Sequence, residues 1–279
     1  MRTLAVSTIT QAVKTLCVDA NVHLGDDMVK ALQKAIPKES SESARSILSQ
    51  LVENAKIAAS DEVPLCQDTG FAVFFVRIGG DVRVDGDIGE AIQEGVRQGY
   101  QQGYLRKSIV GDPLRRTNTG DNTPAVIHYD LVPGDQIEIR FAPKGGGSEN
   151  MSEIRMLRPA DGIEGVRAFV VDRVRRSGGN PCPPLIVGVG IGGTFEKCAQ
   201  LAKRTLFRSV GVRNPDPFYA DLEERLLEEI NALGIGPQGL GGRTTALDVH
   251  IEMFPCHIAS LPVAVNLQCH AARHGRVVL

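Results

Sequence analysis

The stretch PLCQDTGFAVFFVRI, residues 64–78, joins a polar turn to an apolar run. Residues 71–78 are almost continuously apolar, which predicts a strand. Residues 40–59 place apolar side chains at helical spacing behind a Ser-rich start that can cap the first turn. A helix, a turn and a strand are therefore expected in succession, and the turn carries a thiol, an amide and a carboxylate.

Helices and strands alternate irregularly on both sides of this stretch. Helical periodicity runs from Ile88 to Tyr100 behind Asp87, and again from Ile163 to Val174 before a glycine stop at 178–179. Strand patterns cover four further segments: 125–131, 136–141, 185–189 and 247–251. The first two flank VPGD at 132–135 and are interpreted as a hairpin. The sequence predicts a mixed α/β (α+β) fold, an irregular mixed sheet surrounded by helices, in one domain over residues 1–279.

Composition excludes several classes of protein. Of the 279 residues, 42% are hydrophobic and 23% charged, and 31 Lys+Arg stand against 33 Asp+Glu, so no polybasic nucleic-acid or membrane surface is indicated. The opening residues make a poor signal peptide, and no apolar run approaches the roughly 18 residues of a membrane span. The six cysteines are too scattered for a disulfide scaffold. A cytoplasmic enzyme or enzyme subunit with reduced thiols is expected.

Four segments carry chemically active groups. In CQDTG, residues 66–70, a soft metal ligand, a hydrogen-bonding amide and a proton carrier fall within one turn. The alternative is an ordinary helix-to-strand loop in which Asp68 makes a local turn bond. In KGGGSEN, residues 144–150, consecutive glycines expose N–H groups that can wrap a phosphate or carboxylate beside Lys144. Its alternative is a flexible connector.

The third segment is NPCPP, residues 180–184, followed by a G-x-G-x-x-G match at 188–193. A dinucleotide site needs an acidic residue about 20 positions on, at the end of the next strand, whereas residues 210–216 show no clear strand. Tight packing of a helix on the strand is the preferred explanation of these glycines. Cys182 is a candidate ligand, with a packed structural thiol as the alternative.

The fourth segment, residues 255–274, contains two cysteines and three histidines. Cys256-His257 and Cys269-His270 are adjacent pairs that lack the spacing of a zinc clip, so zinc is disfavoured.

Taken together, CQDTG, KGGGSEN, NPCPP with GVGIGG, and HIASLPVAVNLQCHAARH resemble the class I, iron-sulfur-dependent fumarate hydratases and the related L-tartrate dehydratase α subunits. The motifs occur in family order, and the resemblance covers roughly residues 1–275. It implies that Cys66, Cys182 and Cys269 hold a 4Fe-4S cluster. Three thiolates leave one of the four irons open as a Lewis acid.

The resemblance also implies roles for other side chains. Gln67 and Asp68 are expected to contact the substrate, with Asp68 as a proton carrier. Arg106 matches a carboxylate-binding arginine by its spacing, and Arg115 or Arg116 are alternatives. Two further positions complete the expected site: the backbone donor Gly147, and the catalytic His257, which the family delivers from the neighbouring protomer.

The family further implies partners and a reaction. Single-chain members continue into a second domain that is absent here, so a separate β subunit is expected to complete the site, together with homodimerisation through the α subunit. The expected reaction is the reversible hydration of fumarate to L-malate, with L-tartrate or mesaconate as alternative substrates. Two other classes stay open: a nucleotide-dependent oxidoreductase that uses the glycine match, and a non-catalytic dimeric scaffold.

Overall fold

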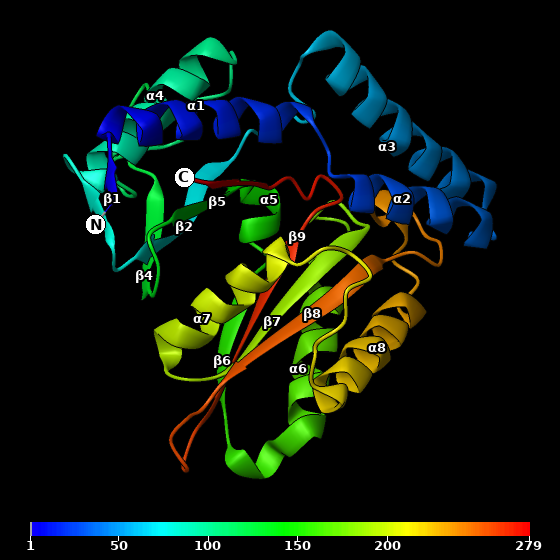
Figure 1. The fold of residues 1–279 in the computed structure, drawn as a ribbon. Helices are drawn as coiled ribbons and strands as arrows, with labels where there is room; N and C mark the ends of the chain where they lie inside the picture. Colours follow the sequence, from blue (N-terminus) through cyan, green and yellow to red (C-terminus); the bar gives the residue numbers. More distant parts are fainter. Residues whose placement is uncertain (1) are drawn as a thin grey trace. The chain divides into compact units, whose positions relative to one another are not determined.

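The computed structural model describes residues 2–279, which form two compact units built from interleaved stretches of chain (Figure 1). The first unit contains the described residues up to Leu24, then Ala55–Gly146 and Arg273–Leu279. The second unit contains Gly25–Asn54 and Gly147–Ala272. Both combine helices with mixed sheets, which confirms the predicted fold class. One domain over 1–279 stays a prediction.

The first unit is built on a four-stranded sheet in the order β10-β5-β2-β4, and β2 is buried along most of its length. β1 and β3, which come before and after β2 in the sequence, form a short parallel pair. Glycines at two successive turns of α4 face Val13 and Cys17 of α1 so closely that a Cβ at either position would clash. The elements are β1 (Arg2–Leu4), α1 (Val6–Val22), β2 (Phe71–Gly79), β3 (Val82–Val84), α4 (Ile88–Gln102), β4 (Val126–Val132), β5 (Ile137–Lys144) and β10 (Gly275–Val278).

The hairpin prediction for this sheet is wrong. Both predicted strands exist, as β4 and β5, but β2 lies between them, parallel to β4 and antiparallel to β5. The turn at 132–135 bonds to the end of β2 instead, where the N–H groups of Gly80 and Asp81 donate to Val132 and Gly134. β2, the most apolar of these strands, is one of the two whose edges are both paired; the other is β5.

The second unit is a four-stranded sheet in the order β6-β9-β7-β8 with helices on both faces (Figure 1). Helices α6 and α8 share one apolar core with the sheet, and α7 packs on the opposite face. The strands are β6 (Glu153–Leu157), β7 (Leu185–Gly192), β8 (Ala246–Phe254) and β9 (Leu261–Gln268). The helices are α2 (Asp26–Ala35), α5 (Gly146–Glu149), α6 (Gly162–Ser177), α7 (Phe195–Arg204) and α8 (Pro217–Ala232). Single 3₁₀ turns cover Ile36–Lys38, Pro159–Asp161, Thr205–Phe207 and Pro237–Gly239.

The remaining sequence predictions for helices and strands are confirmed. Helix α3 covers Glu42–Asp61, α4 begins behind Asp87, whose side chain accepts from the Glu90 N–H, and α6 ends at Gly178 with positive φ. Strands β2, β7 and β8 contain the segments predicted for them. No helix within residues 2–279 has the length and apolar character needed to cross a membrane.

The glycines of β7 serve packing, as predicted. A Cβ at Gly188 would lie 2.2 Å from the Ala202 carbonyl oxygen, and one at Gly190 would lie 2.0 Å from that of Cys198. Both oxygens belong to the region of α7, so the helix backbone lies directly on the strand. Residues 210–216 form no strand. The conditions for a dinucleotide fingerprint are therefore not met.

Candidate functional site

In the first unit, the loop CQDTG precedes β2 and is fixed by the carboxylate of Asp68. One oxygen, Oδ1, accepts from the Gly70 N–H at 3.0 Å, and the other, Oδ2, accepts from the Gly146 N–H at 2.8 Å. Gly70 has a φ of 77°, and a Cβ there would lie 2.6 Å from the Lys144 nitrogen, so only glycine fits. The local turn bond of Asp68 is thus present, and a second bond reaches the glycine-rich segment.

Arg106 lies at this loop, as the resemblance implies. Its Nη1 donates to Oε1 of Gln67 over 2.8 Å, and its carbonyl accepts from the Thr69 hydroxyl at 3.1 Å. The contact is exposed, and a guanidinium has five N–H donors, so most of them stay available to a carboxylate. Neither Arg115 nor Arg116 is seen to bond to the loop. Arg106 is the arginine that the fold places beside Gln67.

Buried polar side chains fix the CQDTG loop by hydrogen bonds to its backbone. The Tyr100 hydroxyl donates to the carbonyl oxygens of Thr69 at 2.7 Å and Gly70 at 3.1 Å. Burial raises the pKa of Tyr100 well above its usual value, so the phenol keeps the proton that it donates. Asn122 also donates to the Gly70 carbonyl, at 3.2 Å. The turn that carries Cys66 and Asp68 is therefore rigidly supported.

Arg273 is a supporting residue that sequence reasoning missed. It is 2% exposed, and its guanidinium donates to the Asp68 carbonyl at 2.8 Å and to Oδ1 of Asn21 at 3.0 Å. No local pattern in the sequence distinguishes Arg273 from an exposed arginine, because both of its partners are distant in the chain.

In the second unit, backbone contacts bring the segments of Cys182 and Cys269 together. The Cys182 carbonyl accepts from the His270 N–H at 3.2 Å, and Nδ1 of His270 lies 3.1 Å from the same oxygen. Gln238 bonds to His270 and to the Pro183 carbonyl. Cys182 has a φ of 55°, an unfavourable conformation for a residue with a side chain, and its thiol is exposed.

Gly147 lies in the short helix α5 and is exposed, in the same unit as Cys182. A Cβ at Gly147 would be 3.5 Å from the Asn180 carbonyl oxygen, which places this glycine beside the NPCPP segment. The KGGGSEN motif is thus a strand end and a helical turn, and the alternative of a flexible connector is wrong for these residues. Lys144, expected as a charge beside the loop, is buried.

His257 lies elsewhere in the second unit. It occupies the turn between β8 and β9, is exposed, and accepts from the Ala259 N–H through Nδ1 at 3.1 Å. Strand β7 pairs with Gln268 near its start and with Phe254 at its end, so Cys269 and His257 lie at opposite ends of the sheet (Figure 1). Eight strand residues span about 25 Å. The chain does not bring its own His257 to Cys182 and Cys269.

The six free cysteines differ in burial. Cys17 and Cys198 are fully buried, and desolvation raises the pKa of both thiols, so they stay protonated. Cys66 and Cys269 are half-buried, whereas Cys182 and Cys256 are exposed. Among residues 2–279, no three His, Cys, Asp or Glu side chains are already gathered as a metal site.

Comparison with known proteins decides the family. The pattern of the family described as fumarate hydratase (Fumerase) matches residues 10–278. The chain belongs to this family. The fumarate hydratase family is one of hydro-lyases, enzymes that add or remove water, and the resemblance inferred from the motifs is confirmed.

Several curated proteins are similar to this member of the fumarate hydratase family over nearly their whole length. A putative L(+)-tartrate dehydratase subunit alpha of Methanocaldococcus jannaschii is 47% identical over 274 residues, covering 96% of both chains. The L(+)-tartrate dehydratase subunit alpha of Escherichia coli O157:H7 is 34% identical over 279 residues, covering 99% of this chain and 92% of that one. The protein of Escherichia coli K12 gives the same values.

Proposed function

We propose that the protein is the α subunit of a two-subunit hydro-lyase that acts on a short dicarboxylate. The observation that carries this proposal is the CQDTG loop, in which Gln67 and Arg106 form one exposed polar group beside the fixed carboxylate of Asp68. A dicarboxylate needs hydrogen-bond donors of this kind, aimed from a rigid support. Family membership supplies the class of reaction.

Three substrates are candidates within this proposal. The family description points to fumarate, which is hydrated to L-malate, and the names of the relatives point to L(+)-tartrate. Mesaconate is the third candidate. All three present a carboxylate to Arg106, so the residues that bind the substituents of the carbon chain decide among them.

Each residue of the loop has a distinct role in the proposed reaction. Arg106 and Gln67 bind and orient a substrate carboxylate. Asp68, whose two oxygens are held by the N–H groups of Gly70 and Gly146, carries a proton to or from the substrate oxygen. The Gly147 N–H, on the exposed α5, is the further backbone donor. His257 takes part from a second copy of the chain, since Cys182 and Cys269 of its own copy lie at the far end of the sheet.

Cys66, Cys182 and Cys269 are the residues that would hold a 4Fe-4S cluster. Their thiols are the accessible ones that lie in the family motifs, while the buried Cys17 and Cys198 stay protonated. The unfavourable backbone conformation of Cys182 also supports a functional role, because such strain is typical of ligand sites. When bound through three thiolates, the cluster supplies one open iron as a Lewis acid.

Two partners belong to the proposal. A β subunit is inferred from the alpha-subunit names of the relatives. Self-association through the β8–β9 turn is supported by its apolar surface, where Ile258 is 92% exposed and Phe254 49% exposed. A pocket of about 370 Å³ next to this turn is lined by Ile163, Phe218 and neighbouring side chains. Exposed apolar surface of this kind marks an interaction site.

Anaerobic reconstitution tests the cluster ligands. The α chain, co-expressed with its β subunit and treated with iron and sulfide, is expected to gain broad absorbance near about 400 nm, typical of iron-sulfur thiolates. Cys66→Ala, Cys182→Ala and Cys269→Ala should each lose most of the bound iron, whereas Cys256→Ala, an exposed thiol at the other end of the sheet, should keep it. Full iron content in Cys182→Ala would overturn the ligand assignment.

Steady-state assays of the same complex test the substrate. Turnover of fumarate, L(+)-tartrate and mesaconate is compared, and the highest kcat/KM identifies the substrate. Arg106→Met should lower kcat/KM by roughly 100-fold, because a charge-assisted bidentate contact is lost. Arg115→Met, an exposed arginine that is not bonded to the loop, is the control. Equal losses in both variants would contradict the role of Arg106.

A further inference from the structure

The second unit contains a cavity of about 1000 Å³ that plays no part in the proposed reaction. Its walls are α2 with the turn that follows it, the segment 210–213, and the residues leading into β8. None of the cysteine or substrate-binding candidates lines it. Volumes of this order accommodate metabolites the size of a nucleotide.

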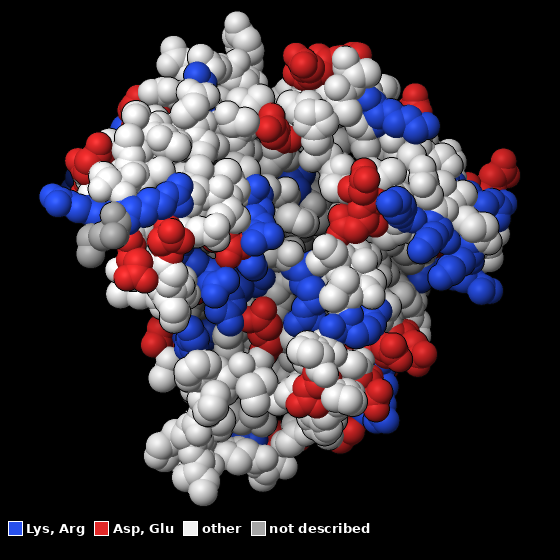
Figure 2. Space-filling model, in the orientation of Figure 1, with Lys and Arg blue, Asp and Glu red and all other residues white. Residues whose placement is uncertain are grey.

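Positive side chains dominate the walls. Lys30 and Lys34 are one helical turn apart on α2, Lys38 follows in the next turn, and Arg243 faces them from the loop before β8. All four are exposed, and no described residue forms an ion pair with any of them. Figure 2 shows Lys and Arg side chains gathered over α2, at the right of the view. Like charges at this spacing repel one another, so an anion between them would be stabilising.

The acidic side chains in the walls are almost all engaged by the protein itself. Asp27 accepts from the Val210 N–H at 2.9 Å. Asp248 is fully buried, and accepts from the Gly211 N–H at 2.6 Å and from Arg213. Only Asp26 stays as an exposed acid of the lining. Five cations of the lining therefore face three carboxylates, so the lining carries a net charge of +2.

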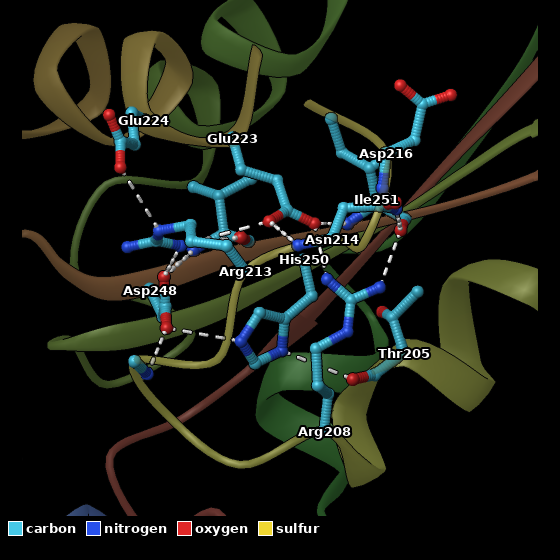
Figure 3. Close-up of polar contacts among 12 residues, drawn as sticks. Thr205, Arg208, Arg213, Asn214, Asp216, Glu223, Glu224, Asp248, His250 and Ile251 are labelled. Atoms are coloured by element: carbon cyan, nitrogen blue, oxygen red, sulfur yellow. Dashed lines mark hydrogen bonds and ion pairs between the residues drawn. The ribbon is translucent and has the colours of Figure 1, made fainter. Parts of the chain in front are cut away.

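A buried polar network forms the floor and fixes it in place (Figure 3). Nε2 of the fully buried His250 lies 3.1 Å from Asp248, which also binds Arg213 of the segment 210–213. Burial by itself would raise the pKa of Asp248, but hydrogen bonds and charge from His250, with the Gly211 N–H and Arg213, lower it, so the carboxylate stays ionised. Glu223 of α8 joins the same segment to β8 by accepting from the N–H groups of Asn214 and Ile251.

A second buried carboxylate fixes the opposite wall. Glu39, 3% exposed, accepts from the N–H groups of Arg243 at 2.8 Å and Thr244 at 2.6 Å. This bond ties the loop that carries Arg243 to the end of the segment that carries the lysines. The backbone segments that carry these cations are thus fixed around a preformed space, which lowers the entropic cost of binding a ligand.

We propose that this cavity is a binding site for a multivalent phosphate anion, either free or as the polyphosphate group of a nucleotide. Four unpaired cations match two or more phosphate groups, and lysine and arginine are the residues that bind phosphate in proteins. Apolar side chains such as Ala31, Leu227 and Leu247 line part of the same space and can contact a base. The site does not depend on the proposed catalytic function.

Titration calorimetry of the full chain with pyrophosphate, ATP and adenosine, without divalent metal, tests the proposal. Pyrophosphate and ATP are expected to bind with one-to-one stoichiometry and to weaken as salt is raised, whereas adenosine should not bind. Tighter binding of ATP than of pyrophosphate assigns the site to nucleotides, and equal affinity assigns it to free phosphate anions. Absence of binding by both anions would overturn the proposal.

Variants locate the binding. Lys34→Ala and Arg243→Ala should each weaken pyrophosphate binding about tenfold, since each removes one charge-assisted contact. Arg225→Ala, which removes an exposed arginine of α8 outside the cavity, should leave the dissociation constant unchanged. Pyrophosphate binding that keeps its full affinity in both cavity variants would overturn the assignment to this cavity.

Discussion

The six thiols fall into groups by burial, and that difference predicts their reactivity. In apo protein, iodoacetamide should modify the exposed Cys182 first and the half-buried Cys66 and Cys269 next. Cys17 and Cys198 should react slower by more than about 100-fold, because burial raises the pKa of both and removes the reactive thiolate. Peptide mass spectrometry over time measures the order, and denatured protein is the control. Early modification of Cys17 would contradict the packing of α1.

Arg273 gives a second prediction at the scale of single residues. Arg273→Met should lower the free energy of unfolding by about 2–3 kcal/mol, because Asn21 and the Asp68 carbonyl lose their buried donors. Urea unfolding followed by circular dichroism measures the change. The exposed Arg115→Met should change it by less than about 0.5 kcal/mol. Similar values for the two variants would show that Arg273 does not support the loop.

Part of the candidate site could be predicted from the sequence, residue by residue. Cys66, Gln67 and Asp68 are adjacent in the sequence, so their proximity needed no fold. The pairing of Arg106 with Gln67 followed from the family resemblance, and the structure places the two in contact. The support by Arg273 could not be predicted, because its partners lie 205 and 252 positions away in the chain.

Among the elements, the contact of β7 with α7 makes a sharp prediction. Gly190→Ala should destabilise the protein by about 3 kcal/mol, since its new methyl group would lie 2.0 Å from a backbone oxygen that cannot move independently of α7. Thermal unfolding measures the loss. Gly111→Ala is the matched control, because a Cβ there lies 3.7 Å from its nearest neighbour. Equal melting temperatures would mean that α7 packs differently.

Sequence patterns identified where the helices and strands lie better than they identified which strands pair. The apolar run of β2 and the periodicity of α3, α4 and α6 are local properties, which is why these predictions succeeded. The order β10-β5-β2-β4 depends on pairing between segments that are far apart in the chain, which no local pattern encodes. A turn sequence such as VPGD fixes a bend without fixing which strands pair across it.

For the whole molecule, self-association is the property to test. Ile258→Glu should shift the α chain from dimer to monomer, because a charge at a 92% exposed apolar tip opposes burial in an interface. Sedimentation velocity measures the two species. Leu114→Glu, a substitution at a 91% exposed side chain in the other unit, should leave the distribution unchanged. A dimer that persists in Ile258→Glu would place the interface elsewhere.

The path of the chain through the first unit has a consequence for biosynthesis. Strand β10 completes the sheet against β5, and Arg273 immediately before it supports the turn that follows Cys66. The ribosome must therefore translate the whole second unit before Arg273 can bond to the cysteine-bearing turn. That turn is made about two hundred codons earlier. Assembly of the proposed iron-sulfur site therefore has to wait until residue 273 has been translated.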